Sequence, residues 1–83
     1  MIKKYPCPCC GYLTLENEQR GGFELCPVCF WEDDGVQFDD PDYRGGANQV
    51  SLNEARNNYT EIGACSKEFV KDVRGPLDTE LPH

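Results

Sequence analysis

Apolar residues recur at helical spacing over residues 51–62. The positions that share one face of a helix are Leu52, Ala55, Tyr59 and Ile62. Ser51 precedes them at the N-cap position and Glu54 follows three residues later, which is the arrangement of a capping box. Gly63 supplies the residue that ends many helices. The pattern predicts one main α-helix over about 52–62, with its apolar face packed in the core.

Two short runs earlier in the chain have the composition of β-strands. They lie at residues 12–15 (YLTL) and 22–25 (GFEL). The residues between them, 16–21, are polar and end in glycine, as a hairpin turn does. We therefore expect the two runs to pair as one β-hairpin.

The patterns after the predicted helix are weaker. A second short helical segment is expected to begin at Ser66 and to end before Gly75-Pro76. Its inward-facing residues would be Phe69, Val70 and Val73. In the tail that follows, Leu77 and Leu81 are candidates for docking onto the core.

Six cysteines give the chain its candidate chemistry. Four of them form two Cys-x-x-Cys pairs, Cys7/Cys10 and Cys26/Cys29, with fifteen residues between the pairs. This spacing is typical of zinc sites, because two intervening residues let a tight turn aim both sulfurs at one point. Four thiolates would surround the ion at about 2.3 Å and leave no position for water, as in structural sites. We predict zinc as the metal, with iron as the alternative.

The residues around these pairs refine the prediction. Gly11 follows the first pair and can adopt positive φ without steric cost. Phe30 stands at the matching position after the second pair, where positive φ is costly, so we expect the second turn to be distorted. Cys9 could replace a ligand of the first pair, although only the 7/10 choice repeats the spacing. Cys65 is expected to be a small buried apolar residue.

A metal would also compensate for the small core. With 83 residues, the chain suits a single domain, and only 39% of its residues are hydrophobic. Its mean hydropathy is −0.65. Domains of this size often need a disulfide, a metal or a partner to be stable. We divide residues 1–83 into a metal-binding hairpin (5–31), an acidic loop (32–50), a helical part (51–75) and a tail (76–83).

The location of the protein bears on the state of its thiols. A secreted protein would pair the six cysteines into three disulfides, and that alternative needs an export signal. Residues 1–6 contain two lysines but no apolar segment follows them, and no stretch has the length of a membrane span. We expect a cytoplasmic protein with no membrane attachment, in which thiols stay reduced and hold metal.

The formal net charge of −7 limits the possible partners. Four thiolates and one divalent ion would contribute −4 + 2 = −2. Such a chain lacks the basic surface of a nucleic-acid-binding protein, so we expect no nucleic-acid partner. Between residues 21 and 55, eight acidic residues face a single basic one, Arg44.

The loop at 32–50 is rich in Asp, Gly and Pro, and we expect irregular backbone there. Long loops in small domains are often functional. An acidic face on this loop would bind a protein partner with a basic surface. The candidate partner-binding residues are Trp31, Asp33, Asp34, Asp39, Asp40 and Asp42.

These positions also have structural interpretations. Trp31 would pack over the metal hairpin, and Asp33 or Asp34 would cap a turn. An enzyme that uses the acidic loop is a further alternative, and it would depend on Asp33 or Asp34. His83 is the only histidine, so no catalytic set of a nucleophile and an imidazole base can be assembled from the sequence.

Three stretches resemble the bacterial cysteine-rich CPCC family. They are YPCPCCGYLT at 5–14, CPVCFWEDD at 26–34 and GANQVSLNEA at 46–55, and the later residues 62–64 and 73–74 also fit. The resemblance covers nearly the whole chain. It implies a small cytoplasmic protein with a metal site, and it implies no specific activity.

The sequence predicts a small metal-stabilised α+β fold, with a zinc-ribbon or rubredoxin-like knuckle hairpin and one main helix. The leading hypothesis is a non-catalytic, zinc-stabilised interaction protein that binds a basic protein partner through its acidic loop. The alternatives are a rubredoxin-like iron protein that transfers electrons, and an enzyme.

Overall fold

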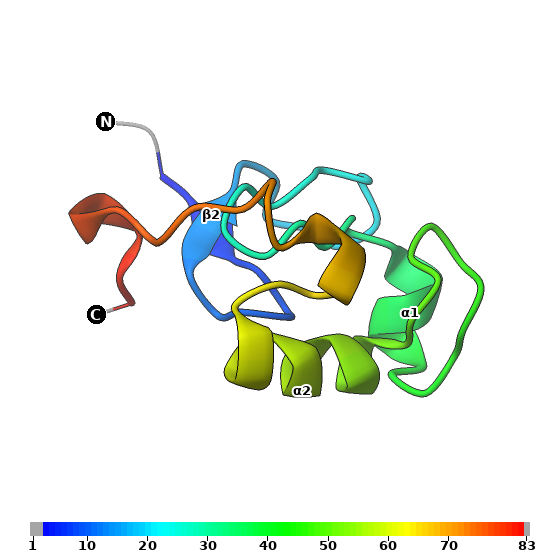
Figure 1. The fold of residues 1–83 in the computed structure, drawn as a ribbon. Helices are drawn as coiled ribbons and strands as arrows, with labels where there is room; N and C mark the ends of the chain where they lie inside the picture. Colours follow the sequence, from blue (N-terminus) through cyan, green and yellow to red (C-terminus); the bar gives the residue numbers. More distant parts are fainter. Residues whose placement is uncertain (1–2, 83) are drawn as a thin grey trace.

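Each Cys-x-x-Cys pair lies in its own short hairpin. The computed structural model describes residues 3–82, which Figure 1 traces in the colours of the sequence. In the first hairpin two strands pair antiparallel, with Tyr5 opposite Leu15. Their bounds are Tyr5–Pro6 for β1 and Leu13–Leu15 for β2. In the second hairpin, Leu25 pairs with Glu32 in an antiparallel bridge.

The predicted pairing of the runs at 12–15 and 22–25 is therefore wrong. Each run pairs across its own cysteine turn, with a segment close to it in the sequence. The polar stretch between the runs is held differently. The carboxylate of Glu24 accepts hydrogen bonds from the backbone N–H of Glu16 at 2.7 Å and of Asn17 at 2.8 Å.

Six residues separate the innermost paired positions in each observed hairpin, the same number as in the predicted one, so loop length does not select the pairing. The observed pairings are those closed by the cysteine turns, in which the N–H of Gly11 bonds Cys7 and the N–H of Phe30 bonds Cys26.

The main helix, α2, spans Leu52–Ile62 as predicted. The Ser51 hydroxyl accepts from the N–H of Glu54, and the Glu54 carboxylate accepts from the N–H of Ser51, both at 3.1 Å. This completes the predicted capping box. Gly63 ends the helix with φ of 77°, and its N–H donates to a carbonyl of the last turn.

The apolar face of α2 is buried only in its first turns. Leu52 and Ala55 are inaccessible to solvent and Tyr59 is half-buried. The ring of Tyr59 meets that of Tyr12 edge-on, with centroids 6.4 Å apart. Ile62 is 42% exposed, so its predicted place in the core is wrong.

A short helix interrupts the loop that the sequence predicted to be irregular. This helix, α1, spans Gly35–Asp39, and the side chain of Asp34 caps it. The Asp34 carboxylate accepts from the N–H of Val36 at 2.8 Å and of Gln37 at 3.2 Å. Figure 1 shows α1 and the loop after it at the end of the molecule opposite the C-terminal segment.

The rest of that loop is held by one buried amide. The Gln37 side chain is inaccessible to solvent, and its Nε2 donates to the carbonyls of Tyr43, Asn48 and Val50 at 3.0 to 3.1 Å. Its Oε1 accepts from the backbone and the side chain of Asn48. The side chain of Asn48 in turn bonds both backbone groups of Glu32. We call this set the Gln37 amide network.

The segment after α2 contains a single turn of 3₁₀ helix, η1 (Lys67–Phe69). Phe69 packs on Phe30, with ring centroids 5.1 Å apart. Val70 is 45% exposed, so its predicted inward orientation is wrong. The N–H of Cys65 donates to the carbonyl of Cys29 at 2.8 Å, which ties this segment to the second cysteine turn.

The tail is held by charge rather than by its leucines. Leu77 and Leu81 are 53% and 41% exposed, so neither docks as predicted. A second 3₁₀ turn, η2 (Asp78–Glu80), contacts β2. The Glu80 carboxylate accepts two hydrogen bonds of 2.8 Å from the Arg74 guanidinium. The predicted tail also includes His83, which lies outside the described residues.

This ion pair makes the attachment of the tail dependent on pH. The Arg74 guanidinium lowers the pKa of Glu80 below its ordinary 4.5, and the N–H of Leu77 adds to the effect. A lowered carboxyl pKa stabilises the attached tail fully above pH 4.5, and this stabilisation is lost as pH falls through the folded-state pKa. Hydrogen exchange should therefore show the Leu77 amide losing protection as pH falls through that range, after correction for intrinsic exchange. In Glu80→Gln, protection at neutral pH should be about fivefold lower, and unchanged protection would contradict this role.

The core is centred on sulfur. The largest inaccessible side chains are Trp31, Leu15 and Leu52, and they surround the buried cysteines. Within residues 3–82, no helix is long and apolar enough to cross a bilayer.

Candidate metal centre

The two cysteine turns, residues 7–11 and 26–30, have the same backbone geometry. The N–H of Gly11 donates to the carbonyl of Cys7, and the N–H of Phe30 donates to the carbonyl of Cys26, both at 2.8 Å. One residue beyond each turn, a carbonyl accepts from the N–H of the first cysteine at 2.9 and 3.0 Å. The fold therefore contains two copies of the same turn, each of which presents two cysteine sulfurs.

Phe30 adopts positive φ, the strained backbone conformation that the sequence analysis expected this position to avoid. Its φ is 71°, close to the 82° of Gly11. The predicted distortion of the second turn is therefore wrong. A bulky residue in this region costs of order 1–3 kcal/mol, and it persists where its surroundings compensate. The packing of Phe30 on Phe69 provides such compensation.

The turns bring four sulfurs together. The Sγ atoms of the predicted ligands Cys7, Cys10, Cys26 and Cys29 all lie within 4.8 Å of one another. The Cys7–Cys29 and Cys10–Cys26 sulfur distances are 3.6 and 3.7 Å. A tetrahedron with metal–sulfur bonds of about 2.3 Å has edges of about 3.8 Å. The four cysteines are therefore positioned to bind one metal ion.

The four ligand candidates lie away from water. Cys7, Cys26 and Cys29 are at most 1% exposed, and Cys10 is half-buried. All six cysteines of the chain carry free thiols. Four protein sulfurs fill a tetrahedral coordination sphere, so a bound ion would have a structural rather than a catalytic arrangement.

The sulfurs differ in their affinity for protons. The pKa of Cys26 lies far below its ordinary value, foremost because of a hydrogen bond from Cys10, with further bonds from Cys29, Cys7 and the Thr14 hydroxyl. The pKa of Cys29 is raised, foremost by its hydrogen bonds with Cys10 and Cys26. The sulfurs hydrogen-bond in pairs through their thiol protons, Cys7 with Cys29 and Cys10 with Cys26. A divalent cation would replace these protons, so its binding releases protons to solvent.

Two further thiols border the four. Cys9 is 9% exposed and Cys65 is 1% exposed, and both belong to the same core cluster. Burial raises the pKa of Cys65 to about 12, and the charges of nearby cysteines, first of all Cys9, add to the effect. The expectation that Cys65 is a buried residue is confirmed. Neither thiol belongs to the group that could hold the ion.

Thr14 is a site residue that the sequence analysis missed. Its hydroxyl lies 3.0 Å from the sulfur of Cys26, and its side chain is buried. Thr14 is the middle residue of β2, and side chains alternate along a strand, so its side chain lies on the face opposite those of Leu13 and Leu15. Hydrogen bonds to a ligand orient it and tune its charge. Cysteine spacing carries no information about such a residue, and a threonine in a β-prone run has an ordinary structural explanation.

Thr14→Val should weaken metal binding without abolishing it. The substitution preserves shape but removes the hydroxyl that bonds the sulfur of Cys26. Loss of such an outer contact costs about tenfold in metal affinity. Competition with a chelator measures the change. Thr60→Val, on the exposed face of α2, is the matched control and should leave the affinity unchanged. Equal affinities in both variants would exclude a role for Thr14.

Three of the predicted partner-binding residues lie inside the protein. Trp31 and Asp33 are inaccessible to solvent, and Asp34 is 6% exposed. Asp33 accepts from the N–H of Gly21 at 3.1 Å and lies 3.5 Å from the Arg20 guanidinium. A partner on the surface does not reach these side chains, so their predicted docking role is corrected to a structural one. The structural alternatives are confirmed for Trp31, which packs in the core with the cysteines, and for Asp34, which caps α1. An enzyme that uses Asp33 or Asp34 loses its geometric support for the same reason.

The other three acids are exposed and close together. Asp39 ends α1, and Asp40 and Asp42 follow it, all open to solvent. Asn53 fixes this stretch against α2, because its side chain donates to Asp42 at 2.9 Å and its N–H donates to the carbonyl of Pro41 at 3.0 Å. We call Asp39, Asp40 and Asp42 the acidic turn.

Comparison with known families agrees with the cysteine pattern. The family described as cysteine-rich CPCC matches residues 5–80, which include all six cysteines. Comparison with curated proteins gives no match. With the match extending from β1 to η2, this chain belongs to the cysteine-rich CPCC family.

Proposed function

We propose that this protein is a zinc-stabilised interaction module that binds a basic protein partner and has no catalytic activity of its own. The observation that carries the proposal is the closed set of four sulfurs within 4.8 Å. Such a set suits zinc, holds the ion without an open position, and adds folding free energy rather than chemistry. Six free thiols suit a reducing compartment, which supports a cytoplasmic location.

The acidic turn is the surface we propose for the partner. It carries three exposed carboxylates on a chain of net charge −7. Exposed apolar side chains flank it, with Phe38 at 40% and Tyr43 at 44% exposure. A surface that combines acidic groups with aromatic contacts suits a basic protein segment, because charge steers the encounter and aromatic burial adds affinity.

Elemental analysis of the protein purified from cells tests the metal. We expect one zinc per chain and six free thiols once the metal is removed. One iron per chain, with the colour and reversible reduction of an iron–tetrathiolate site, would instead support the rubredoxin-like alternative. That alternative draws on the repeated turn geometry, in which residues 11 and 30 share positive φ.

Charge reversal tests the acidic turn. Replacing its three aspartates by lysine should weaken capture of the physiological partner at least tenfold, because opposite charges at the contact become like charges. Quantitative affinity capture from cells that contain the protein measures the loss. A matched variant reverses three exposed acids elsewhere, namely Glu18, Glu61 and Asp72. If both variants lose the same proteins equally, the effect is one of net charge and the acidic turn is not the docking surface.

A further inference from the structure

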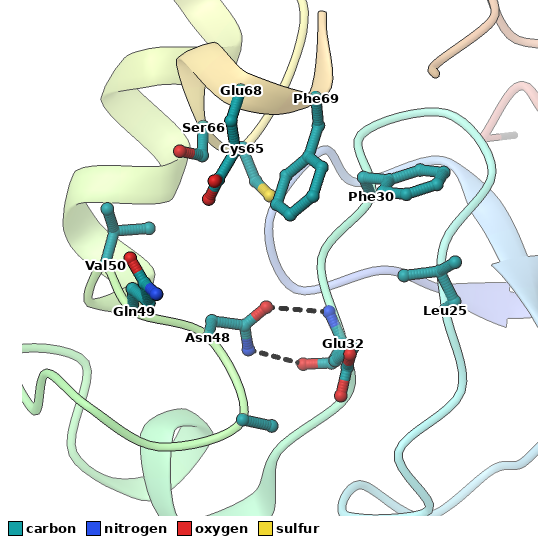
Figure 2. A pocket seen from close by; sticks show the side chains of 11 residues that line it. Leu25, Phe30, Glu32, Asn48, Gln49, Val50, Cys65, Ser66, Glu68 and Phe69 are labelled. Carbon is teal, nitrogen blue, oxygen red and sulfur yellow. Dashed lines mark hydrogen bonds between the residues drawn. The ribbon is translucent and has the colours of Figure 1, made fainter.

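A hollow of about 290 Å³ lies beside the second cysteine turn. Three segments form it: the second hairpin around residues 25–32, residues 47–50 before α2, and residues 65–69. Figure 2 shows side chains from all three segments around the same space. This volume is at the lower limit for ligand pockets, so it suits a single side chain rather than a large cofactor.

One side of the hollow is apolar and firmly held. It consists of the Phe30 and Phe69 rings, tilted by 41° to one another, and of Leu25, which is 47% exposed. The cysteine turn fixes the backbone of Phe30 at φ of 71°. The hydrogen bond from Cys65 to Cys29 holds the segment of Phe69 against the same turn. The aromatic wall is thus attached directly to the metal centre.

Two carboxylates border the apolar wall. Glu32 and Glu68 both line the hollow, and Figure 2 shows them on different segments. The four ion pairs found within residues 3–82 include neither of them. Lys, Arg and His are absent from the lining among the described residues. The hollow therefore combines aromatic surface with negative charge that the protein does not neutralise.

The side-chain amide of Asn48 is already hydrogen-bonded within the protein. It bonds the backbone of Glu32 at 2.9 and 2.8 Å, as the dashed lines in Figure 2 mark, and it also bonds Gln37. It therefore forms a fixed part of the wall and sets the position of Glu32. Recognition of a ligand then depends on the rings and the two carboxylates.

We infer that this hollow binds an arginine side chain of the basic partner. A guanidinium is planar, stacks on aromatic faces and forms paired hydrogen bonds with carboxylates, whereas the compact lysine ammonium is more strongly hydrated. The inference rests on the proposed function, since it specifies how a basic protein is recognised. It adds a second contact region, separate from the acidic turn, and identifies arginine as the partner residue that this region recognises.

NMR titration of the metal-loaded full chain tests the inference. The probe is N-acetyl-arginine amide, and its neutral counterpart is N-acetyl-citrulline amide, which keeps the shape but loses the charge. We expect the backbone amides of Phe30, Glu32 and Glu68 to shift with a dissociation constant of about 1 mM, which corresponds to about 4 kcal/mol. The citrulline probe should bind at least tenfold more weakly. Equal binding of the two probes would overturn the inference.

Matched variants locate the site. Glu32→Gln and Glu68→Gln should each weaken binding of the arginine probe about fivefold, the upper range for a solvent-accessible ion pair. Glu61→Gln removes the same charge from the exposed end of α2 and should bind as the wild type does. Metal content and melting temperature, measured on each variant, separate a binding defect from a folding defect.

The results also separate this inference from the proposed function. Shifts confined to residues 39–42 would exclude the hollow and leave the acidic turn as the docking surface. Arginine binding in the hollow, together with a charge-reversed acidic turn that still captures the partner, would exclude the acidic turn and support the hollow.

Discussion

Removal of the proposed zinc ion should unfold this protein. Five of the ten residues in its buried core cluster are cysteines. Without a cation the thiolates repel one another or take up protons, and little apolar interior remains to hold the chain folded. Structural zinc supplies roughly 10–16 kcal/mol in small peptides, which is comparable to or larger than the roughly 5–15 kcal/mol net stability of a typical domain. Treatment with a strong chelator under reducing conditions should abolish the cooperative melting transition and expand the chain in size-exclusion chromatography. A chelated protein that keeps its melting temperature would contradict a structural metal.

Adjacent cysteines offer a matched control for this prediction. Cys10→Ser removes one of the four clustered sulfurs, and the variant should purify with little or no metal and without a cooperative transition. Cys9→Ser changes the neighbouring buried thiol, which lies outside that cluster, and it should keep a full equivalent of metal. If Cys9→Ser loses the metal and Cys10→Ser keeps it, Cys9 is the ligand and the choice based on spacing is wrong.

The sequence predicted the features that depend on local patterns. The helix α2 has the predicted bounds because its cap, its stop and its apolar face lie within one continuous stretch, from Ser51 to Gly63. The four sulfurs meet because each pair is positioned by its own turn. The helix and the two separate turns arise from interactions a few residues apart, which residue spacing records. The contact between the two turns, by contrast, joins cysteines 16 and 22 residues apart, and it was predicted only because two pairs suffice for one tetrahedral site.

The features that the sequence did not predict depend on contacts between distant residues. Phe30 adopts positive φ against its own preference, and Phe69 packs on it from another segment. The sequence left both a docking and a structural role open for Trp31 and Asp33, and the fold encloses both residues. The runs at 12–15 and 22–25 each pair across a cysteine turn, although the polar stretch between them offers a loop of the same length. Spacing alone does not show which of several compatible partners a residue meets.

The Gln37 amide network is the clearest case of a feature invisible in the sequence. A glutamine in an acidic loop gives no sign that it is inaccessible to solvent, with five hydrogen bonds to residues six to thirteen positions away. Gly46 lies against it: a Cβ added there would stand 2.6 Å from a carboxylate oxygen of Asp34 and 2.9 Å from the Gln37 side chain. The loop between α1 and α2 is therefore packed around this amide.

Gln37→Leu should lower the free energy of unfolding by about 3–5 kcal/mol, because several buried donors and acceptors lose their partners and each costs roughly 1–3 kcal/mol. Urea denaturation of the metal-loaded protein measures the loss. Gln49→Leu, at an exposed position of the same loop, is the matched control and should stay within about 0.5 kcal/mol of the wild type. Metal content should be unchanged in both variants, since the network does not include the four clustered cysteines. A Gln37→Leu variant as stable as Gln49→Leu would show that the loop is ordered by other contacts, such as the hydrogen bonds from Asn53 to Pro41 and Asp42.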